Sequence, residues 1–253
     1  RCRYCVPKEG LSLIGHDDIL RYEEILRIVR IAVGLGVAKV RVTGGEPLVR
    51  RGVIPFMTAL KLMPGIEDLS LTTNGVLLER YAADLRAAGV CRLNISLDSL
   101  NREKYYYITR GGSLANALRG IDAVFAQGFA PIKINVVAMK GFNDNEILDF
   151  ARLTLNRPYQ VRFIELMPVG HAGRDNIGKY LACEEIMGAI ERNYPLLPVN
   201  GARDRTDGPA RMYRIDGGAG KIGFITAMSN HFCHRCNRLR LTAEGHLRSC
   251  LFS

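Results

Sequence analysis

The sequence predicts an α/β fold in which helices alternate with the strands of a parallel sheet. Two observations predict it: stretches with the period of an amphipathic helix alternate with short β-branched runs, and glycine or proline ends most of the helical stretches. The pattern is compatible with an incomplete barrel and with an open, doubly wound sheet. In both folds ligands gather at the carboxyl ends of the strands.

The expected elements follow one another with short connections. A helix at 22–35 carries Glu23 and Glu24 in its first turn, where they suit the positive end of the helix dipole. Gly89 and Gly128 mark the ends of two later helices. We further expect strands at 39–43, 69–72, 91–96, 132–138 and 160–164, and helices at 54–63, 77–88, 114–127 and 146–155.

The chain after residue 181 differs in kind, because a stretch rich in Gly, Pro and Asp predicts a long loop followed by hairpins. The elements expected there are a helix at 184–192, a loop at 195–209, and hairpin strands at 212–215, 221–226, 238–242 and 246–250. We therefore place a domain boundary near Leu181. It divides the chain into a region of residues 1–180 and a smaller, β-rich region of residues 181–253.

The formal net charge of +10 and the hydrophobic content of 47% fit a globular protein with a basic surface or a site for anions. No apolar run approaches the roughly 20 residues that cross a bilayer, so we expect no membrane partner. Aromatic residues lie among basic ones only in the short run Tyr105-Tyr106-Tyr107. No recognised nucleic-acid-binding motif is present, so we expect no nucleic-acid partner.

Polar residues gather at the ends of the expected strands. The first strand is followed by Gly-Gly-Glu-Pro at 44–47, where glycine lets the backbone approach a ligand, and the second by Thr-Asn-Gly at 73–75. Each of these alone is compatible with an ordinary turn or an interior polar group. Together with the next two strands they predict a ligand site. The period of two places Asn94, Ser96 and Asp98 on one face of the third strand, and Lys133 and Asn135 on one face of the fourth.

The seven cysteines are mostly clustered at the two ends of the chain. Closely spaced thiolates hold soft metals or iron–sulfur clusters, and their use here favours a reducing compartment, the cytoplasm or an organelle matrix. Cys91 and Cys183 stand alone in apolar stretches, and we expect both to be buried small hydrophobic residues. The clustered cysteines are Cys2 and Cys5 at the start, and Cys233, Cys236 and Cys250 at the end.

The N-terminal pair matches the last part of a C-x3-C-x2-C motif, whose first cysteine we expect three residues upstream of Arg1. Alone, C-x2-C also occurs in zinc sites and redox pairs. With Gly-Gly-Glu-Pro after the next strand, it resembles the radical S-adenosylmethionine enzymes. That resemblance implies an incomplete (β/α)6 TIM-type barrel and a [4Fe–4S] cluster whose open iron binds S-adenosylmethionine.

The C-terminal cysteines indicate one family within this superfamily. The pattern Cys-x2-Cys-x13-Cys at 233–250 is similar to the auxiliary-cluster region of the molybdenum cofactor biosynthesis protein A family, the GTP 3',8-cyclases. By the residues alone, a structural zinc knuckle completed by His231 or His234 is an alternative. The runs at 41–48, 72–75, 94–98, 162–168 and 237–242 also match this family.

The resemblance implies a lyase that uses a 5'-deoxyadenosyl radical to convert GTP to (8S)-3',8-cyclo-7,8-dihydroguanosine 5'-triphosphate in molybdenum cofactor biosynthesis. It implies one [4Fe–4S] cluster on Cys2 and Cys5, and a second on Cys233, Cys236 and Cys250 that holds the guanine base. The implied S-adenosylmethionine contacts are Tyr4, Gly45, Ser96 and Met167. The implied GTP contacts are Arg41, Thr72, Lys133, Arg238, Leu239 and Arg240.

The cationic residues of this set suit a triphosphate, and Arg238 and Arg240 share one face if 238–240 is a strand. We expect GTP and an electron donor as partners, a next-step enzyme of the pathway as a further candidate, and a monomer or homodimer. Because the first cluster cysteine lies upstream, we expect the intact protein, and not residues 1–253 alone, to be active. The rival interpretations are another radical enzyme with an auxiliary cluster, such as a peptide maturase, and a zinc or nucleic-acid-binding module.

Overall fold

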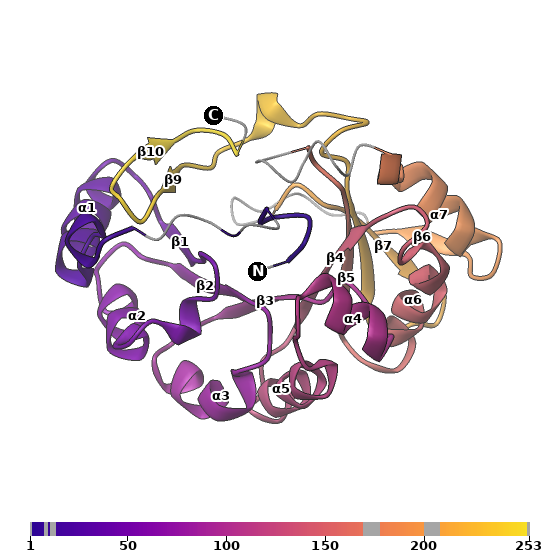
Figure 1. Cartoon of the computed structure of the whole chain (residues 1–253), viewed down its shortest axis with the longest axis horizontal. Coiled ribbons are helices and arrows are strands. Elements are labelled where there is room, and N and C mark those ends of the chain that lie inside the picture. The colour runs from indigo at the N-terminus through magenta and orange to yellow at the C-terminus, as the bar shows by residue number, and fades with distance from the viewer. Residues whose placement is uncertain (1, 8–9, 11–13, 169–177, 200–207, 252–253) are drawn as a thin grey trace.

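The fold is a curved, mostly parallel sheet with helices on its outer side. The computed structural model describes residues 2–7, 10, 14–168, 178–199 and 208–251. Strands line the inside of a crescent, helices cover its outside, and the C-terminal segment runs across the open side (Figure 1). The incomplete barrel that the family resemblance implies is confirmed.

The predicted helices and strands form with small shifts in their bounds. The helices are α1 (Tyr22–Gly34), α2 (Val53–Lys61), α3 (Leu78–Ala87), α4 (Arg102–Ile108), α5 (Leu114–Ala126), α6 (Ile147–Asn156) and α7 (Cys183–Glu191). The strands are β1 (Lys39–Val42), β2 (Asp68–Thr73), β3 (Arg92–Ser96), β4 (Lys133–Ala138), β5 (Gln160–Glu165), β6 (Leu196–Pro198), β7 (Arg211–Ile215), β8 (Lys221–Ile225), β9 (Arg240–Leu241) and β10 (Leu247–Arg248). Among the helices described, none is long and apolar enough to cross a membrane.

Most of the strands belong to one sheet, in the order β1-β2-β3-β4-β5-β8-β7-β6. Strands β1 to β5 run parallel to one another, and β8 runs parallel to β5. The hairpin β7–β8 forms as predicted, but β8 also pairs in parallel with β5, so the C-terminal region extends the barrel sheet. The predicted loop at 195–209 contains a short strand, β6, which pairs with β7. The domain boundary near residue 180 stays a prediction.

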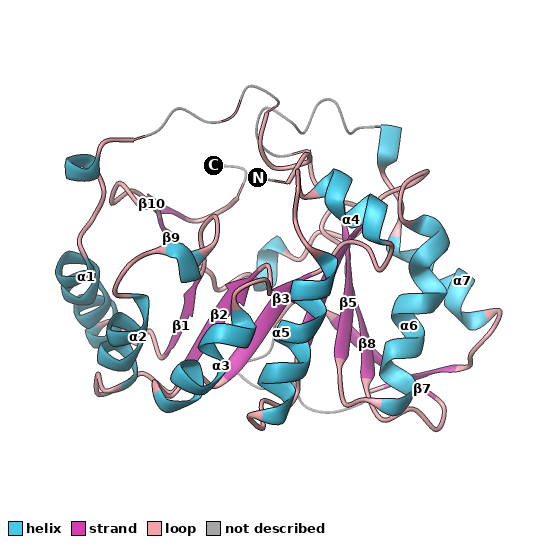
Figure 2. Cartoon of the chain, turned by 60° about the horizontal axis from the view of Figure 1, so that its bottom comes forward, coloured by secondary structure: helices cyan, strands magenta, loops and turns pink. Residues whose placement is uncertain are grey.

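Alternate residues of each strand face either the helices or the hollow of the crescent. The outward residues are apolar and buried, as Leu71, Ile95, Val136 and Phe163 illustrate, and they pack with the helices into one core. Figure 2 shows α2, α3, α5 and α6 side by side along this outer face. The inward residues are mostly polar, so the inner face is where a charged ligand can bind.

One helix is absent from the sequence prediction. Helix α4 contains the three tyrosines, whose mixture with basic residues obscures the helical period. Asn101 caps it, because its Oδ1 accepts hydrogen bonds from the amides of Glu103 at 2.9 Å and Lys104 at 3.0 Å. Tyr105 is buried beneath the helix, whereas Tyr106 and Tyr107 are exposed.

The two isolated cysteines differ from each other. Cys183 is buried, as predicted, but Cys91 is exposed, so the prediction of a buried residue there is wrong. Cys91 lies just before β3, at the amino end of the sheet. Its thiol donates to the Gly89 carbonyl at 3.5 Å, and the Lys61 ammonium lies 3.9 Å from its sulfur.

A close contact between α5 and the turn after β2 yields a stability prediction. A Cβ atom added at Gly120 would lie 2.2 Å from the carbonyl oxygen of Gly75. Replacing Gly120 by Ala therefore forces α5 away from this turn, and we expect the free energy of unfolding in urea to fall by about 1–3 kcal/mol. Gly34→Ala is the control, since its Cβ would have no atom within 4 Å. Equal effects of the two substitutions would contradict this packing.

Candidate functional site

Five cationic side chains of the inner face lie close enough to influence one another electrostatically: Lys39, Arg41, Arg92, Lys133 and Arg162. Within the described strands β1 to β5, Asp68 is the one acidic residue on this face. It forms ion pairs with Arg92 and, at 3.4 Å, with Lys39. The inner face therefore carries a positive charge that suits an anion.

Arg162, on β5, is held by two amide side chains. Its Nε donates to Asn135 Oδ1 at 2.9 Å and its Nη2 donates to Asn94 Oδ1 at 2.6 Å. Both acceptors are neutral, so they fix the guanidinium without cancelling its charge. Burial, together with the charges of Arg41 and Arg92, lowers the pKa of Arg162 to about 9.

Lys133 lies in the same row of the sheet as Thr72, because Thr72 is opposite Asn94 and Asn94 is opposite Lys133. Burial is the main cause that lowers the pKa of Lys133 to about 7, and the charges of four neighbouring cations add to it. Near neutral pH its ammonium therefore loses a proton readily. An anion bound beside it would restore the charged form.

The N-terminal cysteine loop is fastened to α4 and to the end of β3. The amides of Cys5 and Val6 both donate to the Cys2 carbonyl at 3.0 Å, which closes a tight turn. Arg3 N donates to the Ile108 carbonyl at 2.9 Å, and Arg110 Nη2 donates to the Val6 carbonyl at 2.7 Å. Two cysteines are thereby presented on one ordered turn, as a cluster requires.

Asp98 fixes the position of the Tyr4 side chain through a hydrogen bond. Its hydroxyl donates to Asp98 Oδ2 at 2.9 Å, while the Val137 amide donates to Oδ1 at 3.0 Å. Burial raises the pKa of Asp98 to about 6, although these two hydrogen bonds oppose the shift. Asp98 lies two residues after Ser96, so this hydrogen bond holds the Tyr4 side chain at the end of β3.

The Gly-Gly-Glu-Pro turn joins β1 to the end of β2. Glu46 accepts hydrogen bonds from the Thr73 hydroxyl at 2.8 Å and from the Asn74 amide at 2.7 Å. A Cβ atom added at Gly44 or Gly45 would have no atom within 4 Å. The backbone at Gly45 thus borders open space, as the approach of a ligand requires.

Glu165, at the end of β5, organises the start of the C-terminal tail. Its carboxylate accepts hydrogen bonds from the amides of Met228 at 2.7 Å, Ser229 at 2.9 Å and Cys183 at 3.0 Å, and from the Ser229 hydroxyl at 2.6 Å. Desolvation opposes ionisation of Glu165, but these hydrogen bonds outweigh it and lower its pKa. The start of the tail is therefore held at the end of β5.

The C-terminal cysteines lie on a turn and hairpin across the open side of the crescent (Figure 1). Arg238 Nε donates to Cys236 Sγ at 3.4 Å. Desolvation raises the pKa of Cys236, but Arg238 outweighs it and the net pKa is lowered, which favours the thiolate that binds metal. Among the described residues, no three Cys, His, Asp or Glu side chains are grouped to hold a single metal ion.

The structure brings the tail close to the inner face but corrects one expectation about it. The charge of Arg238 lowers the pKa of Arg41, after burial, so the two guanidinium groups are near one another. Strand β9 covers only Arg240 and Leu241, and Arg238 precedes it. The two arginines therefore do not share a strand face. Arg240 donates a hydrogen bond to the Ser249 carbonyl at 3.4 Å. The strand is shorter than expected because the turn that contains Cys233 and Cys236 precedes it.

Several site residues are absent from the sequence prediction. Arg92, Arg162 and Lys39 complete the charge of the inner face, and the period of two that located Lys133 applies to them equally. Glu46 and Glu165 hold neighbouring segments together. No sequence signal marks those contacts, because their partners are backbone amides far along the chain.

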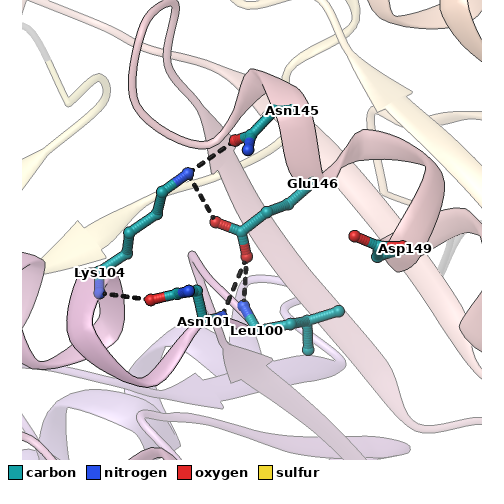
Figure 3. Close-up of a pocket in the computed structure, with 6 residues that line it drawn as sticks. All are labelled: Leu100, Asn101, Lys104, Asn145, Glu146 and Asp149. Carbon is teal, nitrogen blue, oxygen red and sulfur yellow. Dashed lines mark hydrogen bonds and ion pairs between the residues drawn. The ribbon is translucent and has the colours of Figure 1, made fainter.

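A separate polar pocket lies on the outer side of the barrel, between α4 and the start of α6 (Figure 3). Glu146 accepts hydrogen bonds there from the amides of Leu100 at 2.6 Å and Asn101 at 3.2 Å, and it pairs with Lys104 at 3.3 Å. None of the predicted site residues lines it. Its contacts fix the position of α4 on the barrel.

Two family models match the chain. The Radical SAM superfamily matches residues 1–154, and Molybdenum Cofactor Synthesis C matches residues 159–253. The chain is 53% identical over 252 residues to the GTP 3',8-cyclase of Moorella thermoacetica, and 52% identical over 255 residues to that of Geobacter sulfurreducens. Each alignment covers 100% of this chain and 77% of the relative.

Solved structures share the fold at low sequence identity. Streptococcus suis SuiB, bound to S-adenosylmethionine, has a TM-score of 0.55 and 18% identity over 76% of this chain and 43% of its own. TYW1 with a lysine-pyruvate adduct has a TM-score of 0.51 and 15% identity over 80% of this chain and 72% of its own. These likenesses concern the arrangement of the barrel.

The Glu165 contacts generate a prediction about stability and pH. Glu165→Gln should lower the free energy of unfolding in urea by about 1–3 kcal/mol at neutral pH, because the amide cannot replace a charged acceptor of five hydrogen bonds. Since folding lowers the pKa of Glu165, its stabilisation is complete above the unfolded-state pKa and is lost as pH falls through the folded-state pKa.

The variant should accordingly lose less stability than the parent when the pH is lowered from neutral to roughly 4. Glu191→Gln, an exposed position at the end of α7, serves as the matched control and should have little effect. A parent and a Glu165→Gln variant with the same stability at neutral pH would contradict the role given to this carboxylate.

Proposed function

The chain belongs to the GTP 3',8-cyclase family within the radical S-adenosylmethionine superfamily, and on this premise we propose how its residues divide the work of converting GTP to (8S)-3',8-cyclo-7,8-dihydroguanosine 5'-triphosphate. The product is the first intermediate of molybdenum cofactor biosynthesis. The observation that carries the assignment of the substrate is the positive inner face, where five cations meet one carboxylate. A triphosphate is the part of GTP that matches it.

The triphosphate lies, in this proposal, between β1 and β5. Arg41, Lys133 and Arg238 approach it from the barrel and the tail, and Arg240 with the backbone of Leu239 approaches from the hairpin. Thr72 lies one strand from Lys133 in the same row and supplies a hydroxyl. Arg162 and Arg92 add charge from within the sheet. Their fixed hydrogen bonds keep the site preorganised for the anion.

S-adenosylmethionine binds at the carboxyl ends of the same strands. Gly45 offers open backbone, and Ser96 and Met167 lie at the ends of β3 and β5. Tyr4, held by Asp98, is the contact on the side of the cysteine loop. This places the reactive cosubstrate on the same inner surface as the nucleotide, so that water can be kept from both.

We assign two iron–sulfur clusters to the cysteines at the two ends of the chain. Cys2 and Cys5 occupy one turn, Cys233 and Cys236 precede the β9–β10 hairpin, and Cys250 follows it. Bound clusters supply the reducing electron and an open iron for a ligand. The chain's own residues orient the substrates: the arginines hold the phosphates, and the contacts of Glu165 keep the tail over the barrel mouth. The second cluster would raise the iron content of the intact protein to about eight per chain.

The C-terminal arginines provide the test of substrate assignment. Combining Arg238→Ala with Arg240→Ala should weaken GTP binding at least about tenfold, since each charge-assisted hydrogen bond contributes about 1.5–3 kcal/mol. Binding of S-adenosylmethionine should be unchanged. The measurements are equilibrium binding of each ligand and GTP-dependent release of 5'-deoxyadenosine by the anaerobically reconstituted, intact protein.

Arg30→Ala is the control for this pair, because Arg30 is an exposed arginine on α1, on the outer side of the sheet. GTP binding that survives the double substitution would contradict the assigned triphosphate site. So would a matching loss of affinity for S-adenosylmethionine, because it would show that the substitutions damage the site as a whole.

Lys133 gives a second prediction, about protons. Its pKa of about 7 in the free protein should rise when a triphosphate binds, so GTP binding near pH 7.5 should take up protons and should weaken as the pH rises further. Calorimetry in buffers of different ionisation enthalpy measures this uptake. Lys133→Met should abolish most of it, whereas Lys61→Met, on the outer surface, should not. Equal proton uptake by both variants would exclude Lys133 as the group that titrates.

A further inference from the structure

The surface around α4 is aromatic and basic, and no step described so far uses it. Tyr106 is 63% exposed and Tyr107 is 50% exposed. Arg102 lies four residues before Tyr106 and therefore on the same side of the helix. We call Arg3, Arg102, Tyr106, Tyr107 and Lys140 the α4 surface; its three cations are exposed.

The α4 surface is directly connected to the N-terminal cysteine loop. Arg3, which lies between Cys2 and Cys5, places its guanidinium 3.9 Å from the centre of the Tyr107 ring and donates from Nε to the Tyr107 carbonyl at 2.9 Å. The Tyr107 ring also contacts the ring of Phe142, with 6.1 Å between the two centroids. Phe142 lies two residues after Lys140 in the sequence. Figure 1 and Figure 2 both show α4 beside the N-terminal segment.

The same surface is rigid, which favours docking without a large cost of ordering. Asn101 caps α4, and Glu146 holds the preceding turn through the amides of Leu100 and Asn101 (Figure 3). Lys104 donates to the Phe142 carbonyl at 2.5 Å and to Asn145 Oδ1 at 2.6 Å, which joins the helix to the segment that bears Lys140. Glu103 is the acidic residue of α4, and it is exposed. The three cations of the α4 surface therefore exceed the negative charge of this helix.

We infer that the α4 surface docks an acidic one-electron carrier protein that reduces the cluster held by the Cys2–Cys5 loop. The inference rests on the proposed function, in which that cluster must be reduced before each cleavage of S-adenosylmethionine. One electron leaves the reduced flavin or iron–sulfur group of the carrier and enters the cluster, so the carrier is oxidised by one electron and the cluster reduced by one. Basic charge and exposed aromatic rings suit an acidic partner, and Arg3 brings the docked partner next to the cysteine loop.

The test compares two reductants on the intact, reconstituted protein. A flavodoxin hydroquinone, which is an acidic protein, serves as the carrier, and dithionite serves as a small reductant that needs no docking surface. Combining Arg102→Glu with Lys140→Glu should slow cluster reduction by flavodoxin at least about tenfold at low ionic strength. The difference should shrink as salt is added. Formation of 5'-deoxyadenosine with dithionite should be unchanged, which also verifies that the variant folds.

Arg30→Glu combined with Arg214→Glu changes the net charge equally on exposed positions of α1 and β7, and it should leave the flavodoxin rate near that of the parent. Equal slowing by the two double variants, or no slowing by either, would overturn the inference. A change in oligomeric state or in salt-sensitive RNA binding, with unchanged flavodoxin kinetics, would assign the surface to another partner and overturn it as well. Failure of the parent to form 5'-deoxyadenosine with dithionite would instead contradict the proposed function.

Discussion

The constraint on which the rest of the structure depends is the crowding of positive charge inside the barrel. Arg41, Arg92, Lys133 and Arg162 face one another across neighbouring strands, and Asp68 neutralises only part of this charge. Burial is the main cause that lowers the pKa values of Lys133 and Arg162, and repulsion from the neighbouring cations adds to it. The apolar core on the outer side must stabilise the sheet against the repulsion between these cations, and a bound polyanionic substrate reduces that repulsion.

Carboxylates at the strand ends hold this charged interior in shape. Glu46 after β1 binds the end of β2, Asp98 after β3 binds Tyr4 and β4, and Glu165 at the end of β5 binds the start of the tail. Each accepts at least one backbone amide from a segment distant in sequence. Together they bring residues from the two ends of the chain to the carboxyl edge of one sheet, where both substrates are proposed to meet.

The sequence predicts the elements and much of the site, because local signals determine them. Glycine residues at helix ends, helical periods and the alternation of strand residues locate nearly every helix and strand. The alternation also places Ser96 and Lys133 on the inner face. Contacts between distant segments have no such signal. For that reason the parallel pairing of β8 with β5, the helix around Tyr105 and the exposure of Cys91 emerge only in three dimensions.

The central claim is that the positive inner face binds the triphosphate of GTP, and competition calorimetry on the intact, reconstituted protein tests it most directly. We expect inorganic triphosphate to displace GTP, guanosine to bind at least about a hundredfold more weakly, and the affinity for GTP to fall as salt is added. Guanosine that binds as tightly as GTP, with no effect of salt and no displacement by triphosphate, would contradict the claim.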